Sequence, residues 1–133
     1  MLKFEINPYV GVDDVFFDMT REAVRKILGQ YKEFKKTPAS KNTTDDFNFC
    51  HVFYDLNNKA EAVEFFAGNG LIFKETDLFS MDYKGLLQFI KTHSTNYSED
   101  DSGVIINDLG FAVYAPDKNT IETILVFRKG YYD

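Results

Sequence analysis

The run FNFCHVFYDLNNKAEAVEFF, residues 47–66, decides the fold prediction. Its first part, residues 47–55, is rich in aromatic and β-branched side chains, which favours a strand. Residues 56–59 follow as a turn, because the two asparagines there tolerate the positive φ that tight turns need. Residues 60–66 then return as a second strand. The run therefore predicts an antiparallel hairpin.

Helical patterns lie on both sides of this hairpin. Before it, Thr20 is the expected N-cap of a helix, since its hydroxyl can accept a backbone N–H. After it, Asp82 is the expected N-cap of a second helix. Apolar side chains recur at helical spacing in both segments and form a stripe on each helix: Ala23, Val24, Ile27, Leu28 and Tyr31 in the first, and Leu86, Leu87, Phe89 and Ile90 in the second.

The remaining segments are assigned to short strands and two polar loops. Strands are expected at residues 12–17, 71–74, 104–106, 111–115 and 121–128. The polar stretches 32–46 and 96–102 are expected to be loops. The first is about fifteen residues long, which exceeds most connections in compact domains. It is therefore either a contact surface or a solvated linker.

The two halves of the chain resemble each other at an offset of 62 positions, the difference between Phe17 and Phe79. This offset also places the cap Thr20 on the cap Asp82. Further identical pairs at the same offset are Met19 and Met81, Asp46 and Asp108, Phe49 and Phe111, Asp55 and Asp117, and Asn57 and Asn119. We therefore predict one domain, residues 1–133, with an internal pseudo-repeat of approximately 12–70 and 74–131. The alternative is a single α+β domain with coincidental echoes.

The fold class that follows is α+β with two layers. Two tandem helix-plus-antiparallel-hairpin units are expected to form one mostly antiparallel sheet, and both helices are expected to pack on one face of it. This fold class depends on the repeat, because overlooking an internal repeat would misassign the whole fold.

The start of the first helix carries a family resemblance. Residues 15–24, VFFDMTREAV, resemble the F-x-M-T-x-E-x-V helix start of bacterial small outer-membrane assembly lipoproteins and of the beta-lactamase inhibitory protein family. In that inhibitor family, two helix-plus-sheet units join into a curved sheet whose concave face grips an enzyme. The resemblance implies a shared architecture rather than a shared target. This chain departs from both relatives, because it has a single Cys and no signal-like segment.

Composition and charge narrow the classes of partner. The chain carries 21 acidic and 15 basic residues, a formal charge of −6, which repels nucleic-acid phosphates and attracts basic proteins. The 14 Phe and 8 Tyr residues supply a core, or rigid contact side chains for a partner. No run approaches the roughly 18 apolar residues of a membrane span, so we expect a cytoplasmic protein.

Catalytic patterns are weak throughout the sequence. Cys50 lies in an apolar run and is expected to be an inert, buried thiol. It neighbours His51 on a predicted strand, so the two side chains should point to opposite faces. The acidic pairs at 13–14, 45–46 and 100–101 lie in polar stretches where solvated carboxylates are expected. We therefore predict no enzyme activity, no metal site and no cofactor.

The function that we predict is the binding of another protein. The chain is expected to be a small cytoplasmic bacterial inhibitor or toxin-immunity-type protein, a monomer or weak dimer, whose partner is basic and is neither nucleic acid nor membrane. The candidate contacts are the loop residues and their flanks, Tyr31, Phe34, Asp45, Asp46, Tyr97, Glu99, Asp100 and Asp101, with Tyr131 and Tyr132 as second choices.

Two rival functions remain open. The first is a small-molecule-binding module with a pocket between helices and sheet, lined by Phe residues and His51. The second is a structural or oligomerising domain that uses a sheet edge.

Overall fold

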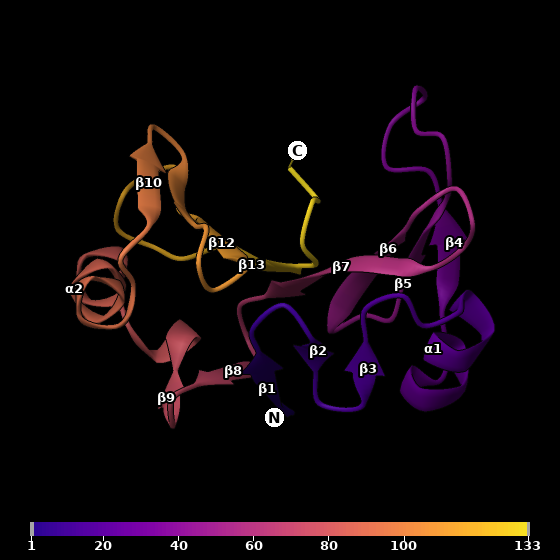
Figure 1. The fold of residues 1–133 in the computed structure, drawn as a ribbon, viewed down its shortest axis with the longest axis horizontal. Coiled ribbons are helices and arrows are strands. Elements are labelled where there is room, and N and C mark those ends of the chain that lie inside the picture. Colours follow the sequence, from indigo (N-terminus) through magenta and orange to yellow (C-terminus); the bar gives the residue numbers. More distant parts are fainter. Residues whose placement is uncertain (1, 133) are drawn as a thin grey trace.

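The computed structural model describes residues 2–132, and it consists mainly of strands, with 40% strand and 17% helix. The strands form an eight-stranded and a five-stranded sheet (Figure 1). All neighbours in the larger sheet are antiparallel. From edge to edge, the larger sheet contains β10 (Tyr97–Asp100), β11 (Gly103–Ile106), β12 (Phe111–Tyr114), β13 (Thr123–Phe127), β7 (Ala60–Phe66), β6 (Cys50–Tyr54), β5 (Thr44–Asp46) and β4 (Lys32–Phe34).

The smaller sheet is built from the N-terminal residues and from the segment between the two halves of the larger sheet. Its order is β3 (Val15–Phe16), β2 (Gly11–Val12), β1 (Lys3–Asn7), β8 (Gly70–Phe73) and β9 (Thr76–Asp77). Strands β1 and β8 are parallel, and the other neighbours are antiparallel. This parallel pair joins the beginning of the chain to its middle.

The hairpin predicted from residues 47–66 is confirmed. Strand β6 pairs antiparallel with β7, and Val52 lies opposite Val63. The register shifts near Tyr54, which lies opposite Ala60, so Glu61 is the additional residue of a β-bulge in β7. The other edge of β7 pairs with β13, which makes β7 one of the two central strands.

Both predicted helix caps are confirmed. Helix α1 (Arg21–Leu28) begins after Thr20, whose Oγ1 accepts the N–H of Ala23 at 3.3 Å. Helix α2 (Tyr83–His93) begins after Asp82, whose Oδ1 accepts the N–H of Gly85 at 2.8 Å. Each bond satisfies one of the N–H groups that a helix start leaves without a partner. A short 3₁₀ helix, η1 (Leu78–Ser80), precedes α2.

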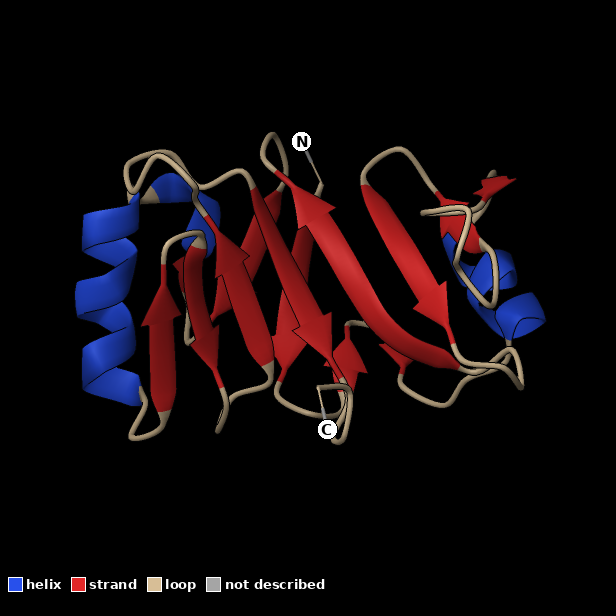
Figure 2. Cartoon of the chain, turned by 90° about the horizontal axis from the view of Figure 1, so that it is seen from above, coloured by secondary structure: helices blue, strands red, loops and turns tan. Residues whose placement is uncertain are grey.

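The predicted fold class is wrong. The two helices lie at opposite ends of the larger sheet, and the strands of the smaller sheet cross behind its middle (Figure 2). The fold is therefore mostly β with two sheets, and not one sheet with both helices packed on a single face. Four antiparallel strands, rather than one hairpin, follow each helix, so the two-unit arrangement that we predicted is also wrong.

Polar strands account for much of this error. The stretch 32–46, predicted as a loop, contains β4 and β5, and the stretch 96–102 contains β10. These strands lie at or next to the edges of the sheet, where one side faces water and polar side chains are common. Their sequences therefore lack the apolar alternation that marks an internal strand.

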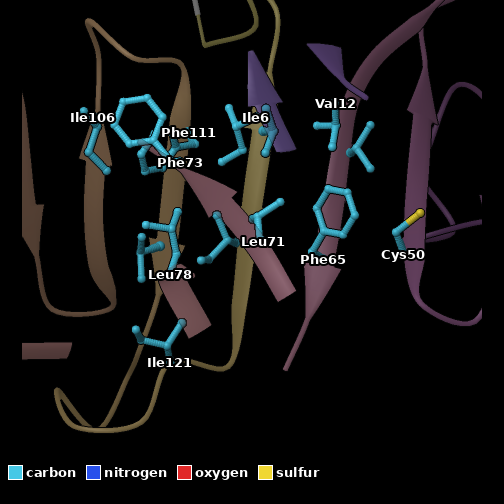
Figure 3. Packing of buried hydrophobic residues seen from close by; sticks show 14 of the residues in the cluster. Ile6, Val12, Cys50, Phe65, Leu71, Phe73, Leu78, Ile106, Phe111 and Ile121 are labelled. Atoms are coloured by element: carbon cyan, nitrogen blue, oxygen red, sulfur yellow. The ribbon is translucent and has the colours of Figure 1, made fainter. Parts of the chain in front are cut away.

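The core lies between the two sheets (Figure 3). Phe65 of β7 and Leu71 of β8 are fully buried there, and Phe111 of β12 packs beside Phe73 with ring centroids 5.5 Å apart. A fully buried aromatic ring removes roughly 150–250 Å² from water, so these rings are a large part of what holds the sheets together. The phenylalanine-rich core expected from composition is confirmed.

Candidate functional site

The face of the larger sheet that points away from the smaller sheet is the candidate site. It carries a second apolar cluster around Phe53, Ala62 and Phe127. Both ends of the sheet rise on this side, and the C-terminal segment lies between them (Figure 1). We call it the open face and define it by side chains that alternate with the core residues: Phe34, Asp46, His51, Phe53, Ala62, Glu64, Phe66, Ala112, Tyr114, Leu125 and Phe127.

Aromatic rings run across the open face at the β4 end. His51 lies between Phe34 and Phe66, with ring centroids 5.0 and 4.7 Å away, both edge to face. Next to them, the ammonium group of Lys36 lies 4.5 Å from the centre of the Phe53 ring. Edge-to-face contacts of this kind add stability beyond simple burial. The rings therefore form a fixed surface rather than a set of loose side chains.

The last turns of the chain cover the middle of the open face. Tyr131 stacks on Phe127 at 5.9 Å, and Tyr132 meets Phe127 edge to face at 5.0 Å. Tyr132 remains 55% exposed, and Tyr114 nearby is 45% exposed. Rigid, half-exposed tyrosines offer a large contact area at a small cost in conformational entropy.

Among the grooves that border these tyrosines, two are also lined by Lys36. The first has a volume of about 320 Å³ and ends against Tyr131. The second has a volume of about 330 Å³ and ends against Tyr132. The second groove is lined by Lys36, Glu64, Asp100, Ser102, Val104, Ile105, Ala112, Val113, Tyr114, Thr123, Leu125 and Tyr132.

Glu64 is an unpaired charge on the open face. It lies between His51 on β6 and Leu125 on β13, partly exposed, and it makes no hydrogen bond or ion pair with another residue of the described chain 2–132. Its neighbour Glu61 instead accepts a hydrogen bond from Arg128 at 3.3 Å. A carboxylate that forms no ion pair in a groove favours a basic group from outside.

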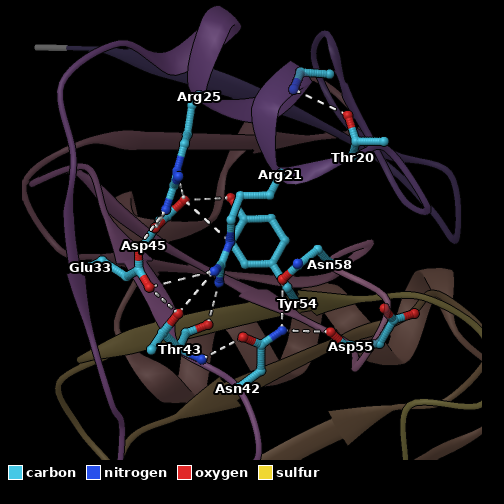
Figure 4. Close-up of polar contacts among 11 residues, drawn as sticks. Thr20, Arg21, Arg25, Glu33, Asn42, Thr43, Asp45, Tyr54, Asp55 and Asn58 are labelled. Atoms are coloured by element: carbon cyan, nitrogen blue, oxygen red, sulfur yellow. Dashed lines mark hydrogen bonds and ion pairs between the residues drawn. The ribbon is translucent and has the colours of Figure 1, made fainter.

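On the other side of the sheet, a buried ionic network joins α1 to the edge strands (Figure 4). Asp45 is completely buried, and its two oxygens accept hydrogen bonds from Nε and Nη2 of Arg25 at 2.7 and 2.8 Å. The hydroxyl of Tyr54 donates to the same carboxylate at 2.9 Å. The bond to Asp45 raises the pKa of Arg25, while burial is the main cause that raises the pKa of Tyr54.

Arg21 completes this network. Its guanidinium lies 4.1 Å from the centre of the Tyr54 ring and donates to Oγ1 of Thr43 at 2.9 Å. Its Nε is 3.9 Å from Asp45, beyond hydrogen-bond distance, and is buried without a hydrogen-bond partner in the described chain. Because the other polar groups of the network are paired and its central carboxylate is completely buried, the network is a structural anchor for α1, β5 and β6.

The structure separates the predicted contact residues into two groups at opposite edges of the sheet. Tyr31, Phe34, Asp45 and Asp46 lie at the β4 edge, and Tyr97, Glu99, Asp100 and Asp101 lie at the β10 edge. Of the first group, Phe34 and Asp46 belong to the open face. Asp45, expected at the surface, is buried, and Tyr31 lies on the opposite side beneath the guanidinium of Arg25 at 3.9 Å.

The second group is engaged mostly in local contacts. Tyr97 packs against the core, and Glu99 accepts hydrogen bonds from Tyr83 at 2.7 Å and Lys118 at 3.2 Å. Asp100 accepts from the backbone of the tight turn after β10 and also lines the second groove. Asp101 is exposed at the tip of that turn. Sequence reasoning missed Glu64 and Tyr114, although alternation along the strands could have placed both on one face.

Cys50 and His51 point to opposite faces, as predicted. Cys50 is buried in the core, whereas His51 packs with the rings of the open face. Burial raises the pKa of the Cys50 thiol from its ordinary 9.0 to about 12. The predicted burial of the thiol is confirmed, and its raised pKa disfavours the thiolate, which is the reactive form.

This raised pKa predicts a loss of stability in alkali. The thiol stays neutral in the fold while the unfolded chain ionises, so its contribution is complete below pH 9 and is lost as the pH rises toward 12. Between pH 8 and 10.5, we expect wild type to lose about 2 kcal/mol more unfolding free energy than Cys50→Ala. Urea unfolding at the two pH values checks this, because Cys50 is the one titratable group that differs between the two proteins. Equal losses would contradict it.

The described residues also bear on metal binding and on membrane insertion. Among residues 2–132, no group of three or more His, Cys, Asp or Glu side chains has an arrangement suited to a metal ion. Neither helix in this range has the length and apolar character needed to cross a bilayer.

No protein-family model, curated protein or solved structure matches this chain. The likeness of residues 15–24 to the assembly lipoproteins and the inhibitor family therefore stays a prediction from the sequence.

Proposed function

We propose that this chain is a non-enzymatic protein-binding protein whose partner seats on the open face. The observation that carries the proposal is the unpaired Glu64 in a groove that is also lined by the exposed Tyr114 and Tyr132. Interfaces concentrate their binding energy in a few central aromatic and charged side chains, surrounded by contacts that exclude water. The open face presents both kinds of side chain in one groove.

The partner that this surface fits is a basic protein. The whole chain carries a formal charge of −6, which steers a basic partner toward it. Glu64 then offers a specific site for an Arg or Lys side chain, with tyrosine rings in the lining of the same groove for cation–π contact. Lys36 lines the same groove, but its ammonium group lies over the Phe53 ring at 4.5 Å and makes no ion pair with Glu64 in the described chain.

The biological role that we infer is that of a small cytoplasmic bacterial inhibitor or toxin-immunity-type protein. Such a protein works by covering a surface of its target, which requires a rigid, preformed face. The open face lies on an eight-stranded sheet, and its rings are held by one another. Preorganisation of this kind lowers the entropy cost of association.

The experiment pairs two tyrosines that are equally exposed but lie on opposite sides of the sheet. Tyr114 and Tyr31 are each 45% exposed, the first on the open face and the second beneath Arg25. With a partner isolated from the native host, we expect Tyr114→Ser to raise the dissociation constant at least about tenfold. Tyr31→Ser should change it less than about twofold, the result typical of a residue outside an interface.

Calorimetric titration of the purified partner measures both constants, and Glu64→Gln adds a test of charge. We expect this variant to weaken binding and to reduce its dependence on salt, because one attractive pair is lost. A partner that loses affinity with Tyr31→Ser but not with Tyr114→Ser would place the interface elsewhere. Recovery of no partner from the host would overturn the proposal itself.

A further inference from the structure

We propose a small-molecule site on the core side of the larger sheet, which takes a compound with one apolar ring and a single positive charge. The site is a cavity of about 200 Å³ between the β2–β3 hairpin, the end of α1 and strands β6 and β7. It is lined by Phe4, Val12, Asp13, Asp14, Val15, Ile27, Leu28, Cys50, Val63 and Phe65. Since it lies across the sheet from the open face, it is independent of the proposed protein partner.

The size and lining of the cavity select an apolar ring. Figure 3 shows Val12, Phe65 and Cys50 in this part of the core. An apolar cavity of about 150 Å³ in another protein stays dry and binds benzene, so about 200 Å³ accommodates one six-membered ring with a short substituent. The raised pKa keeps the Cys50 thiol neutral, so the interior carries no charge of its own.

The mouth of the cavity selects a cation. Two carboxylates, Asp13 and Asp14, belong to its lining, and no Lys, Arg or His does. One oxygen of Asp13 accepts the backbone N–H of Glu5 at 2.9 Å, which holds the turn in place. Asp14 is exposed and makes no hydrogen bond or ion pair with the rest of residues 2–132. An ammonium group on a short arm from the ring would reach this free carboxylate without losing contact with water.

The entrance lies beside Ile27. This side chain belongs to the last turn of α1 and is 44% exposed, although it lines the cavity. A larger side chain at this half-exposed position can lie across the mouth rather than in the core, so Ile27→Trp is expected to close the entrance without overfilling the core. The rival pocket predicted from sequence included His51, but His51 lies on the open face and does not line this cavity.

The test compares three ligands of nearly equal shape and different charge: benzylamine, benzyl alcohol and benzoate. Each is titrated into the full chain at millimolar concentration, and the methyl groups of Val12, Val63 and Leu28 are followed by NMR. We expect benzylamine to shift these methyl signals and to bind about fivefold more tightly than benzyl alcohol, the effect of one exposed ion pair. Benzoate should bind more weakly than either.

Two variants and one control variant assign the contacts. Asp14→Asn should remove the preference for benzylamine and leave the affinity for benzyl alcohol unchanged, while Asp101→Asn, at the far hairpin, should change neither. Ile27→Trp should abolish the shifts with all three ligands, and its amide spectrum reports whether the fold is kept. The absence of methyl shifts in wild type, equal affinities for the three ligands, or an unaltered preference in Asp14→Asn would each overturn the proposal.

Discussion

Replacing Asp45 with asparagine is expected to lower the free energy of unfolding by about 3 kcal/mol. The carboxylate is completely buried and holds Arg25 through two hydrogen bonds and Tyr54 through one. An amide in its place carries no charge and turns an N–H₂ group toward one of these donors. The value lies at the low end for broken buried ion pairs, because Arg25 is 20% exposed and can partly return to water.

The neighbouring residue supplies the matched control. Asp46 lies beside Asp45 in β5 but faces the open side, 33% exposed and 3.5 Å from Nε2 of His51. Asp46→Asn is expected to cost less than about 1 kcal/mol, as exposed pairs do. Urea unfolding of the two variants under the same conditions measures the difference. If the two substitutions cost the same, Asp45 would not be the structural anchor that its contacts indicate.

Local chemistry was the part of the fold that could be predicted. Thr20 and Asp82 cap helices because a single side chain beside a helix start is enough to satisfy an N–H group, and no distant residue is needed. The hairpin of β6 and β7 likewise depends on alternation and on one turn. The duplication suggested by the 62-residue offset stays a prediction from the sequence, even though it aligns these two caps.

Asp45 shows why the edge strands were missed. Adjacent acidic residues in a polar stretch are typical of a loop, and only a partner elsewhere in the chain makes one of them suitable for burial. Those partners are Arg25, which donates hydrogen bonds to Asp45, and Arg21, whose Nε lies 3.9 Å from it; they are four residues apart on one face of α1. Two arginines at this spacing, followed by an acidic pair, were the sequence pattern that could have indicated a buried carboxylate. The pattern does not identify which of the two carboxylates the arginines contact.

The second sheet depends on contacts over a still longer range. Strand β1 pairs in parallel with β8, so that Phe4 lies opposite Leu71. Neither segment carries a turn signal that points to the other, and parallel pairing needs a long crossover. The candidate site could not be predicted from the sequence for the same reason. Glu64 and Tyr114 belong to one groove only because β7 and β12 both flank β13, and that order is a property of the assembled sheet.

Replacing Gly103 with alanine is expected to cost at least about 3 kcal/mol, from steric conflict with backbone added to an unfavourable φ. Gly103 begins β11 with a φ of +154°, and an added Cβ would lie only 1.8 Å from the carbonyl oxygen of Val113 on β12. That oxygen belongs to a strand held on both sides, so it cannot move away without breaking the pairing of β11 with β12. Gly29 provides the comparison: its φ is +92°, but a Cβ there meets no atom within 4 Å.

Gly29→Ala is accordingly expected to cost about 1–2 kcal/mol, from backbone strain alone. Urea unfolding separates the two substitutions, and amide hydrogen exchange locates the damage. Exchange should accelerate in β10 and β11, because β10 pairs only with β11 at the edge of the sheet. Equal costs for the two substitutions would mean that β11 can shift away from β12.

Strands β10 and β11 also form one raised end of the open face, so Gly103→Ala should weaken partner binding even though Gly103 itself presents no side chain to a partner.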